Sequence, residues 1–223
     1  MTAVVHPAFG PRRATSRATT WWGRAWVRAV EETAYADRDL VAARALARSG
    51  HVRGITTDAG RFVAAVEDAD GMWTVSGTVP VLDEQAGAVL VETVAAESGR
   101  IAALLAGELP HDLVEHAEEA GVELLPYGGE LATECTCTSW VDPCVHALAV
   151  LAQLTWLVET DPLILLQLRG VPRDDLLARL HAGAEVVEPA VADDLETGLD
   201  AAMRAAALLR LAGEPDQPLD HLI

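Results

Sequence analysis

The stretch "CTCTSWVDPCVHALAVL", residues 135–151, contains every cysteine of the chain, together with one histidine. These side chains form two pairs, Cys135 with Cys137 and Cys144 with His146, and one residue separates the members of each pair. Structural zinc sites bind the metal tetrahedrally through four thiolate or imidazole ligands. We therefore predict a metal site with these four residues as ligands.

The backbone expected around each pair allows the four side chains to converge. Residues two apart on a strand share a face, so Cys135 and Cys137 can project together from a strand or a tight turn. On a regular helix the same separation turns two side chains about 200° apart. Cys144 and His146 therefore converge only if Cys144 precedes a helix whose first turn contains His146. Pro143 supplies that break, because the residue before a proline avoids the helical conformation.

Two other interpretations of the cysteines stay open. Free cysteine is often a small apolar core residue, but that role does not explain why all of them lie in one stretch. A disulfide between Cys135 and Cys137 would close a short and strained loop. A structural metal explains the spacing better. Three thiolates and one imidazole give a zinc site a net charge of about −1, which the N-terminus of a following helix can offset.

Four protein ligands favour a structural metal, because catalytic zinc keeps an open position for water. The nearest candidate bases, Glu134 and Asp142, are expected to be surface acids that flank the loop. His111, Glu115 and His116 share a helix, but their spacing is not that of a His-Glu-x-x-His protease. The sequence has no phosphate-binding glycine loop or nucleophile elbow. We predict a protein that is not an enzyme, with an unrecognised hydrolase as the third hypothesis.

The pattern Cys-x-Cys-x(n)-Cys-x-His resembles the SWIM zinc finger. The stretch at 135–151 is similar to the form in bacterial SWIM proteins, with a Trp in the loop, Asp-Pro before the third Cys and an alanine-rich helix after the His. Three flanking stretches also resemble standalone SWIM-domain proteins of the actinobacterial type: "TTWWGRAWVRAVE" (19–31), "AALLAGELPHDLVEHAEEAGVELLP" (102–126) and "DPLILLQLRG" (161–170).

The resemblance implies one structural Zn²⁺ bound by Cys135, Cys137, Cys144 and His146. It also implies a role in DNA binding or protein–protein interaction, and association with Swi/Snf-type helicase-like ATPases. Relatives often have a basic residue between the last Cys and the His, where this chain has Val145. That difference disfavours direct contact between the finger and nucleic acid.

Charge is distributed unevenly along the chain, whose net charge is −18. Residues 1–61 contain ten Arg and five acidic residues, whereas residues 62–223 contain six Arg and twenty-nine acidic residues. Nucleic-acid affinity comes largely from neutralising phosphates. Our first hypothesis is therefore an acidic body that docks a protein partner. The alternative is a DNA- or RNA-binding module that uses the N-terminal arginines, Arg12, Arg13, Arg17, Arg24 and Arg28.

The remaining patterns predict an α+β protein that is mostly helical. Residues 52–79 alternate in polarity and break at two Gly-containing turns, which predicts a three-stranded antiparallel meander. "WWGRAW" (21–26) places Trp22 and Trp26 on one helical face; we favour core packing over a base-stacking platform. Further helices are expected over 37–50, 83–99, 100–107, 110–120, 161–170, 172–183 and 199–213.

We expect five segments. They are a basic N-terminal arm (1–20), an α+β domain (21–130), the zinc finger as a short hairpin plus helix (131–160), a helical extension (161–182), and an acidic linker with a C-terminal helix (183–223).

The longest apolar run, residues 145–158, is shorter than the roughly 18 to 20 residues of a membrane span. The start of the chain lacks the apolar region of a secretory signal. We therefore expect a cytoplasmic protein without membrane contact. The absence of Lys and the abundance of Ala and Val are typical of a GC-rich genome and favour a bacterial source.

Overall fold

The computed structural model of the protein describes residues 3–13, 18–186 and 198–206. Its contacts divide the chain into two units, Met1–Arg179 and Leu180–Ile223. The elements in chain order are β1 (Val4–His6), α1 (Trp21–Thr33), α2 (Asp37–Ser49), β2 (Val52–Asp58), β3 (Arg61–Asp68), β4 (Gly71–Thr78), α3 (Glu84–Ala95), α4 (Ser98–Leu105), α5 (His111–Glu119), η1 (Gly128–Glu130), β5 (Ala132–Cys135), α6 (Val145–Thr160), α7 (Pro162–Leu168) and α8 (Arg173–Val186).

The second unit holds the end of α8 and a helical segment at residues 198–206. The rest of the helix predicted over 199–213 lies outside the described residues, as does most of the predicted acidic linker.

The sheet has five antiparallel strands in the order β1-β2-β3-β4-β5, so the prediction of a three-stranded meander was incomplete. Strands β2, β3 and β4 pair in succession over the predicted residues, but they form only the centre of the sheet. β1 pairs with β2 (Val5 opposite Thr56), and β5 pairs with β4 (Thr133 opposite Gly77). The edge strands have three and four residues, too few for an alternating pattern to stand out.

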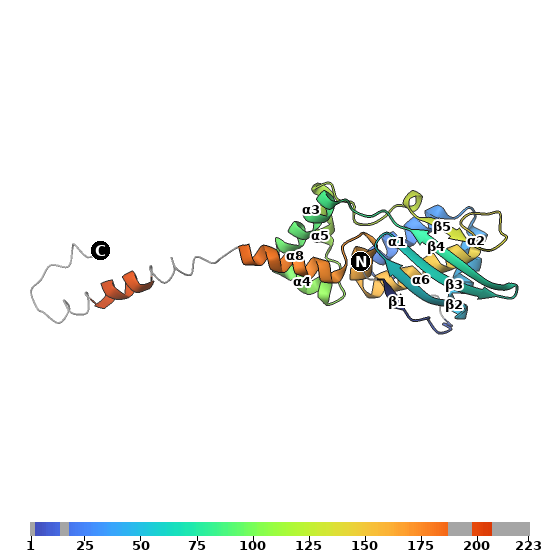
Figure 1. The fold of residues 1–223 in the computed structure, drawn as a ribbon, viewed down its shortest axis with the longest axis horizontal. Coiled ribbons are helices and arrows are strands. Elements are labelled where there is room, and N and C mark those ends of the chain that lie inside the picture. Colours follow the sequence, from blue (N-terminus) through green and yellow to red (C-terminus); the bar gives the residue numbers. More distant parts are fainter. Residues whose placement is uncertain (1–2, 14–17, 187–197, 207–223) are drawn as a thin grey trace, which may run out of the picture. The chain divides into compact units, whose positions relative to one another are not determined.

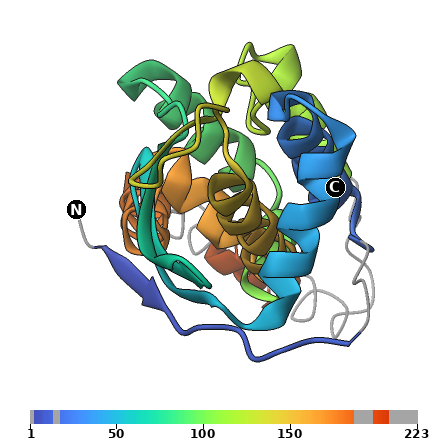
Figure 2. The same cartoon turned by 90° about the vertical axis from the view of Figure 1, so that its right-hand side faces the viewer.

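Helix α6 forms the middle layer of the first unit. It packs against β2, β3, β4 and β5 on one side and against α1 and α2 on the other, as the end-on view in Figure 2 shows. A helix that is apolar on all sides is expected in a buried position. Leu148, Leu151 and Leu154 of α6 are fully buried. The apolar run after the last Cys therefore forms the central core helix.

Helices α3, α4 and α5 pack together, and α4 also contacts α7. They lie beside the sheet in Figure 1.

The ends of several helices follow the signals in the sequence. Asp83 caps α3 by accepting from the Ala86 amide, and Asp161 caps α7, which begins at Pro162. Gly50 ends α2 with a φ of 83°, as the predicted stop at this glycine requires.

Trp22 and Trp26 of α1 are core residues, as predicted, and Trp21 is partly buried. Trp22 and Trp26 are buried, and the Trp22 Nε1–H donates to the Val158 carbonyl on α6 at 3.0 Å. Trp21 donates to the Leu109 carbonyl at 3.0 Å. None of these rings is exposed enough to serve as a stacking platform for bases.

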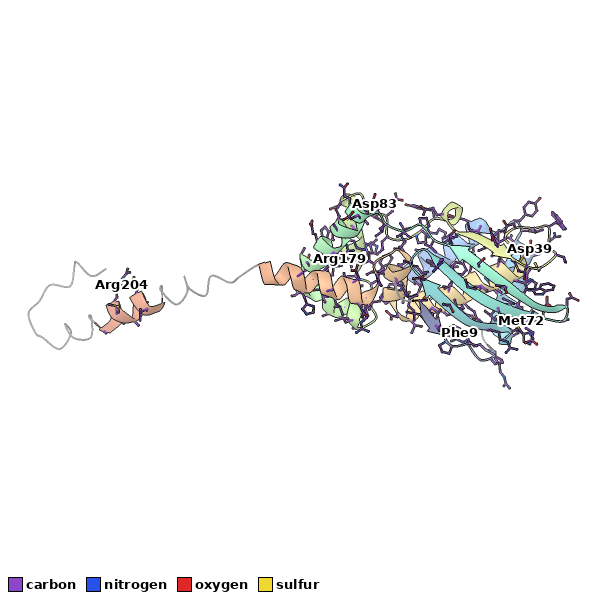
Figure 3. The ribbon with its side chains drawn as sticks, in the orientation of Figure 1. Phe9, Asp39, Met72, Asp83, Arg179 and Arg204 are labelled. Atoms are coloured by element: carbon purple, nitrogen blue, oxygen red, sulfur yellow. The ribbon has the colours of Figure 1, made fainter. Side chains whose placement is uncertain are left out.

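Gly77 of β4 lies opposite Phe62 of β3, in the hairpin whose tip is marked by Met72 in Figure 3. A Cβ at this position would lie 2.1 Å from Cζ of the buried Phe62 ring. We expect Gly77→Ala to lower the free energy of unfolding by about 1–3 kcal/mol, because the close-packed ring must move. Urea denaturation measures the change. Gly10→Ala is the control, since a Cβ there meets nothing within 4 Å; equal losses from the two variants would contradict the expectation.

Candidate metal centre

The four predicted ligands meet at the junction of β5 and α6. Cys135 is the last residue of β5, Cys137 lies in the following loop, Cys144 precedes α6 and His146 lies in its first turn. Their sulfur and nitrogen ligand atoms all lie within 4.8 Å of one another. Four side chains from a stretch of twelve residues are thus gathered into one cluster with the donor set of a zinc site.

The start of α6 has the geometry that the sequence predicts. Cys144 is extended, with φ of −76° and ψ of 171°, and α6 begins at Val145. The Cys144 sulfur accepts from the Ala147 amide at 3.5 Å, so this ligand is also the cap of the central core helix. The conversion from loop to helix at this point turns Cys144 and His146 toward each other.

The prediction of a short hairpin within the finger was wrong. β5 pairs with β4, so the first ligand pair is attached to the main sheet. The pairing continues past Cys135: the Thr136 amide donates to the Thr74 carbonyl at 3.0 Å, and the Thr74 amide donates to Thr136 Oγ1 at 2.9 Å. The four-residue β5 is stabilised by a longer neighbouring strand, which a reading of the local sequence does not reveal.

Asp68, at the end of β3, orients the histidine. His146 Nε2 donates to Asp68 Oδ2 at 2.8 Å, while Nδ1 lies 3.9 Å from the Cys135 sulfur. Nδ1 is therefore the nitrogen that faces the thiols. A carboxylate behind a metal-binding histidine fixes its tautomer and ring orientation. The ring of Trp73 stacks on His146 with centroids 6.0 Å apart.

The Asp68 carboxylate is itself held in place by several donors. Its Oδ1 accepts from the amides of Asp70 and Gly71 at 2.9 and 3.1 Å and from Trp73 Nε1 at 3.0 Å. Burial raises the pKa of Asp68, but the hydrogen bonds from His146, Trp73 and the two amides outweigh burial and lower the pKa to about 2. Asp68 is therefore an ionised carboxylate, and it accepts a hydrogen bond from the Nε2–H group of His146.

Sequence reasoning missed both Asp68 and Trp73. The turn at Asp70-Gly71 was visible, but nothing in the local sequence links Asp68 to His146, 78 residues away. Asp68 and Trp73 come close to His146 only because β3, β4 and β5 pair with one another.

The thiols do not ionise together without a cation. Burial raises the pKa of Cys135 to about 12 and also raises the pKa of Cys144. Burial also raises the pKa of Cys137, but the Ser139 amide, His146 and the two other cysteines outweigh it and lower that pKa to about 7. Three thiolates in one place need a divalent ion to balance them, and metal binding releases their protons. The donors, their convergence and the carboxylate behind His146 all fit zinc.

The other candidate groups do not join this cluster. Glu134 and Asp142 are exposed, as expected for surface acids. His111 pairs with Glu115 at 3.2 Å on the surface of α5. A second group that could be considered for a metal, Glu97, Asp112 and His116, surrounds the buried guanidinium of Arg100, which already supplies its positive charge.

The structure does not gather all four of the described N-terminal arginines, Arg12, Arg13, Arg24 and Arg28, into one site. The guanidinium of Arg12 stacks on the rings of Phe9 and Trp156, 4.7 and 4.4 Å from their centroids. Arg13 is exposed, and Arg24 and Arg28 are exposed one turn apart on α1. Arg17 lies outside the described residues.

Replacing Asp68 with asparagine should weaken zinc binding about 10- to 100-fold, because the carboxylate behind the histidine sets its orientation and basicity. Competition with a chromophoric chelator measures the affinity. Asp70→Asn is the matched control, since Asp70 contacts Asp68 through its amide and not through its carboxylate. Equal zinc affinity in the Asp68 and Asp70 variants would show that the carboxylate has no such role.

Comparisons with known proteins agree with this geometry. The SWIM zinc finger family model matches residues 121–154, which include all four clustered residues. The chain is similar to the uncharacterized protein Rv2102 of Mycobacterium tuberculosis, with 30% identity over 215 residues that cover 92% of this chain and 77% of the relative. No solved structure matches the chain. Among the described helices, none has the length and apolarity to cross a membrane. The chain belongs to the family of this mycobacterial protein and contains a SWIM zinc finger.

Proposed function

We propose that the protein is a non-enzymatic interaction protein whose zinc finger docks a protein partner. One structural Zn²⁺, held by Cys135, Cys137, Cys144 and His146, would tie β5 to α6 and fix the loop between them. The four protein ligands complete a tetrahedral shell, which suits a structural role.

The exposure of Trp140 is the observation that carries this proposal. Its side chain lies in the loop between the second and third cysteines and is 86% exposed. Tryptophan is costly to leave in water and is enriched among residues that dominate protein–protein binding energy. Metal ligands at both ends of the loop would restrain its backbone, so that less order has to be gained on binding.

The charge around the loop favours a protein partner over nucleic acid. Glu134 precedes the loop, Asp142 lies within it, and both are exposed. The sequence has no Arg or Lys between residues 101 and 168. Such a surface repels phosphates and suits a basic protein surface. The resemblance to SWIM proteins makes a Swi/Snf-type helicase-like ATPase the first partner to test.

Capture of partners from the host's extract tests the proposal. The bait is the zinc-loaded protein, with nuclease added, and the variants are Trp140→Ala and Val5→Ala. Val5 is an exposed apolar residue on β1, at the opposite edge of the sheet from β5. We expect an ATPase-containing complex that survives nuclease and the Val5 change, but is lost with Trp140→Ala. Retention by both variants would contradict docking through the finger.

Direct nucleic-acid binding is the second candidate, and the exposure of Arg13, Arg24 and Arg28 favours it. Binding through these residues would weaken steeply with added salt, and neutralising the three arginines would flatten that dependence. Fluorescence anisotropy with labelled single- and double-stranded oligonucleotides measures it. Absence of binding at low salt would remove this candidate.

A further inference from the structure

A cavity on the side of α6 opposite the sheet has no role in the finger. Helices α1 and α2 each pack on α6, but they make no extensive contact with one another. The space between them is a cavity of 520 Å³, within the range of about 300–1,000 Å³ that is usual for small-molecule sites. Its floor is α6 and its two walls are α1 and α2, all of which belong to the first unit.

The inner surface of the cavity is apolar. Val27 and Val30 of α1, Leu40 and Ala43 of α2, and Leu148 and Ala152 of α6 line it. The α2 wall and the floor each carry small side chains, Ala43 and Ala152. Val27 and Ala152 are partly exposed and can contact a ligand directly, and Val30, Leu40, Ala43 and Leu148 are buried next to them.

Three arginines also line the cavity, Arg24 from α1 and Arg44 and Arg48 from α2. Arg44 pairs with Glu31, the one acidic residue of the lining. Arg24 donates only to the backbone carbonyl of Thr19, at 2.5 Å, and Arg48 has no side-chain partner within the described part of the chain. Among the described residues, the guanidinium groups of Arg24 and Arg48 at this cavity have no ion-pair partner.

Both uncompensated arginines lie toward the C-terminal half of α6. Thr20, at the start of α1, donates to Glu159, and the Ala47 carbonyl on α2 accepts from Gln153 at 2.8 Å. Arg12 adds a third positive charge here, because its amide donates to the Arg48 carbonyl at 2.9 Å and its guanidinium stacks on Trp156, a lining residue. Figure 3 labels Phe9, the second ring that Arg12 contacts, on the arm after β1.

We propose that this cavity binds a small amphipathic anion, with an apolar body between the helices and a carboxylate or phosphate head on Arg24 and Arg48. Guanidinium groups suit both heads because their paired N–H groups match the oxygens of either. The apolar lining excludes a bare inorganic anion as the preferred ligand, since such an ion leaves the cavity floor uncovered. The cavity lining and the ligand cluster have no residue in common, and each proposal stands without the other.

Displacement of a fluorescent probe tests the site on the full-length, zinc-loaded protein. Anilinonaphthalene sulfonate, itself an apolar anion, should bind and brighten. Laurate, dodecyl phosphate and dodecanol then serve as competitors of one chain length. We expect the two anions to displace the probe at concentrations at least about tenfold lower than the alcohol, because charge-assisted hydrogen bonds to the head are lost with dodecanol. The ratio of laurate to dodecyl phosphate affinity identifies the preferred head.

Variants connect the binding to the named residues. Arg24→Met with Arg48→Met should weaken probe and laurate binding about tenfold or more. Arg28→Met, an exposed change on α1 outside the lining, is the matched control. Ala152→Phe fills the cavity and should abolish binding, and Trp140→Ala should leave it unchanged. Failure of the probe to bind the wild type, equal displacement by dodecanol, or wild-type affinity in the double arginine variant would each overturn the proposal.

Discussion

Replacing Cys144 with serine should remove zinc from the protein and lower the stability of the first unit by at least about 3 kcal/mol, since structural zinc sites contribute their binding free energy to folding. Cys144 joins two functions. Its sulfur belongs to the ligand cluster, and it also caps α6, the helix that packs on both the sheet and α1–α2. Loss of this side chain therefore destabilises the central core helix as well as the metal site.

Metal content by mass spectrometry and thermal unfolding by circular dichroism measure both parts of this expectation. Chelation of wild-type protein should produce the same drop in the melting temperature. Thr138→Ser is the control, a change of similar size at an exposed loop position between the second and third cysteines. A Cys144→Ser variant with full zinc content and an unchanged melting temperature would show that Cys144 is not a ligand.

Arg169→Met should cause the largest loss of stability after Cys144→Ser. The Arg169 side chain is 5% exposed and donates to the Pro80 carbonyl at 2.5 Å and to the Glu123 carbonyl at 2.7 Å. Burial lowers the pKa of Arg169, while the charges of Glu130 and Glu123 raise it. The side chain thus ties the chain after β4 and the chain before the finger to the end of α7.

Methionine preserves most of the length of the side chain but donates nothing, so two carbonyls lose their partner. We expect the free energy of unfolding to fall by about 2–4 kcal/mol, because an unsatisfied buried polar group costs about 1–3 kcal/mol. Chemical denaturation measures the loss. Arg38→Met, at a side chain that is 78% exposed, should change stability by less than about 0.5 kcal/mol. Similar effects from both variants would contradict the structural role of Arg169.

The parts of the fold that follow from local chemistry could be predicted from the sequence. Gly50, Asp161 and Pro162 mark helix ends because capping depends on neighbouring residues alone. The four clustered residues could be identified because they fall within one short stretch. Trp22 and Trp26 were placed in the core by their spacing on one face of α1.

The parts that depend on distant pairing could not be predicted. β1 and β5 are strands because longer strands pair with them, and the finger therefore uses β4 in place of a hairpin of its own. Asp68 acts on His146 only after β3, β4 and β5 align. The cavity between α1 and α2 could not be predicted either, because its size depends on how far apart these two helices pack on α6.

X-ray absorption at the zinc edge of the full-length protein tests the central claim most directly. The account predicts one zinc per chain with three sulfur neighbours at about 2.3 Å and one nitrogen neighbour at about 2.0–2.1 Å. The Asp68→Asn variant should keep this ligand set at saturating zinc. A shell that contains water or carboxylate oxygen in place of one sulfur, or a protein that purifies and folds without zinc, would contradict the assignment of Cys135, Cys137, Cys144 and His146 as a closed structural site.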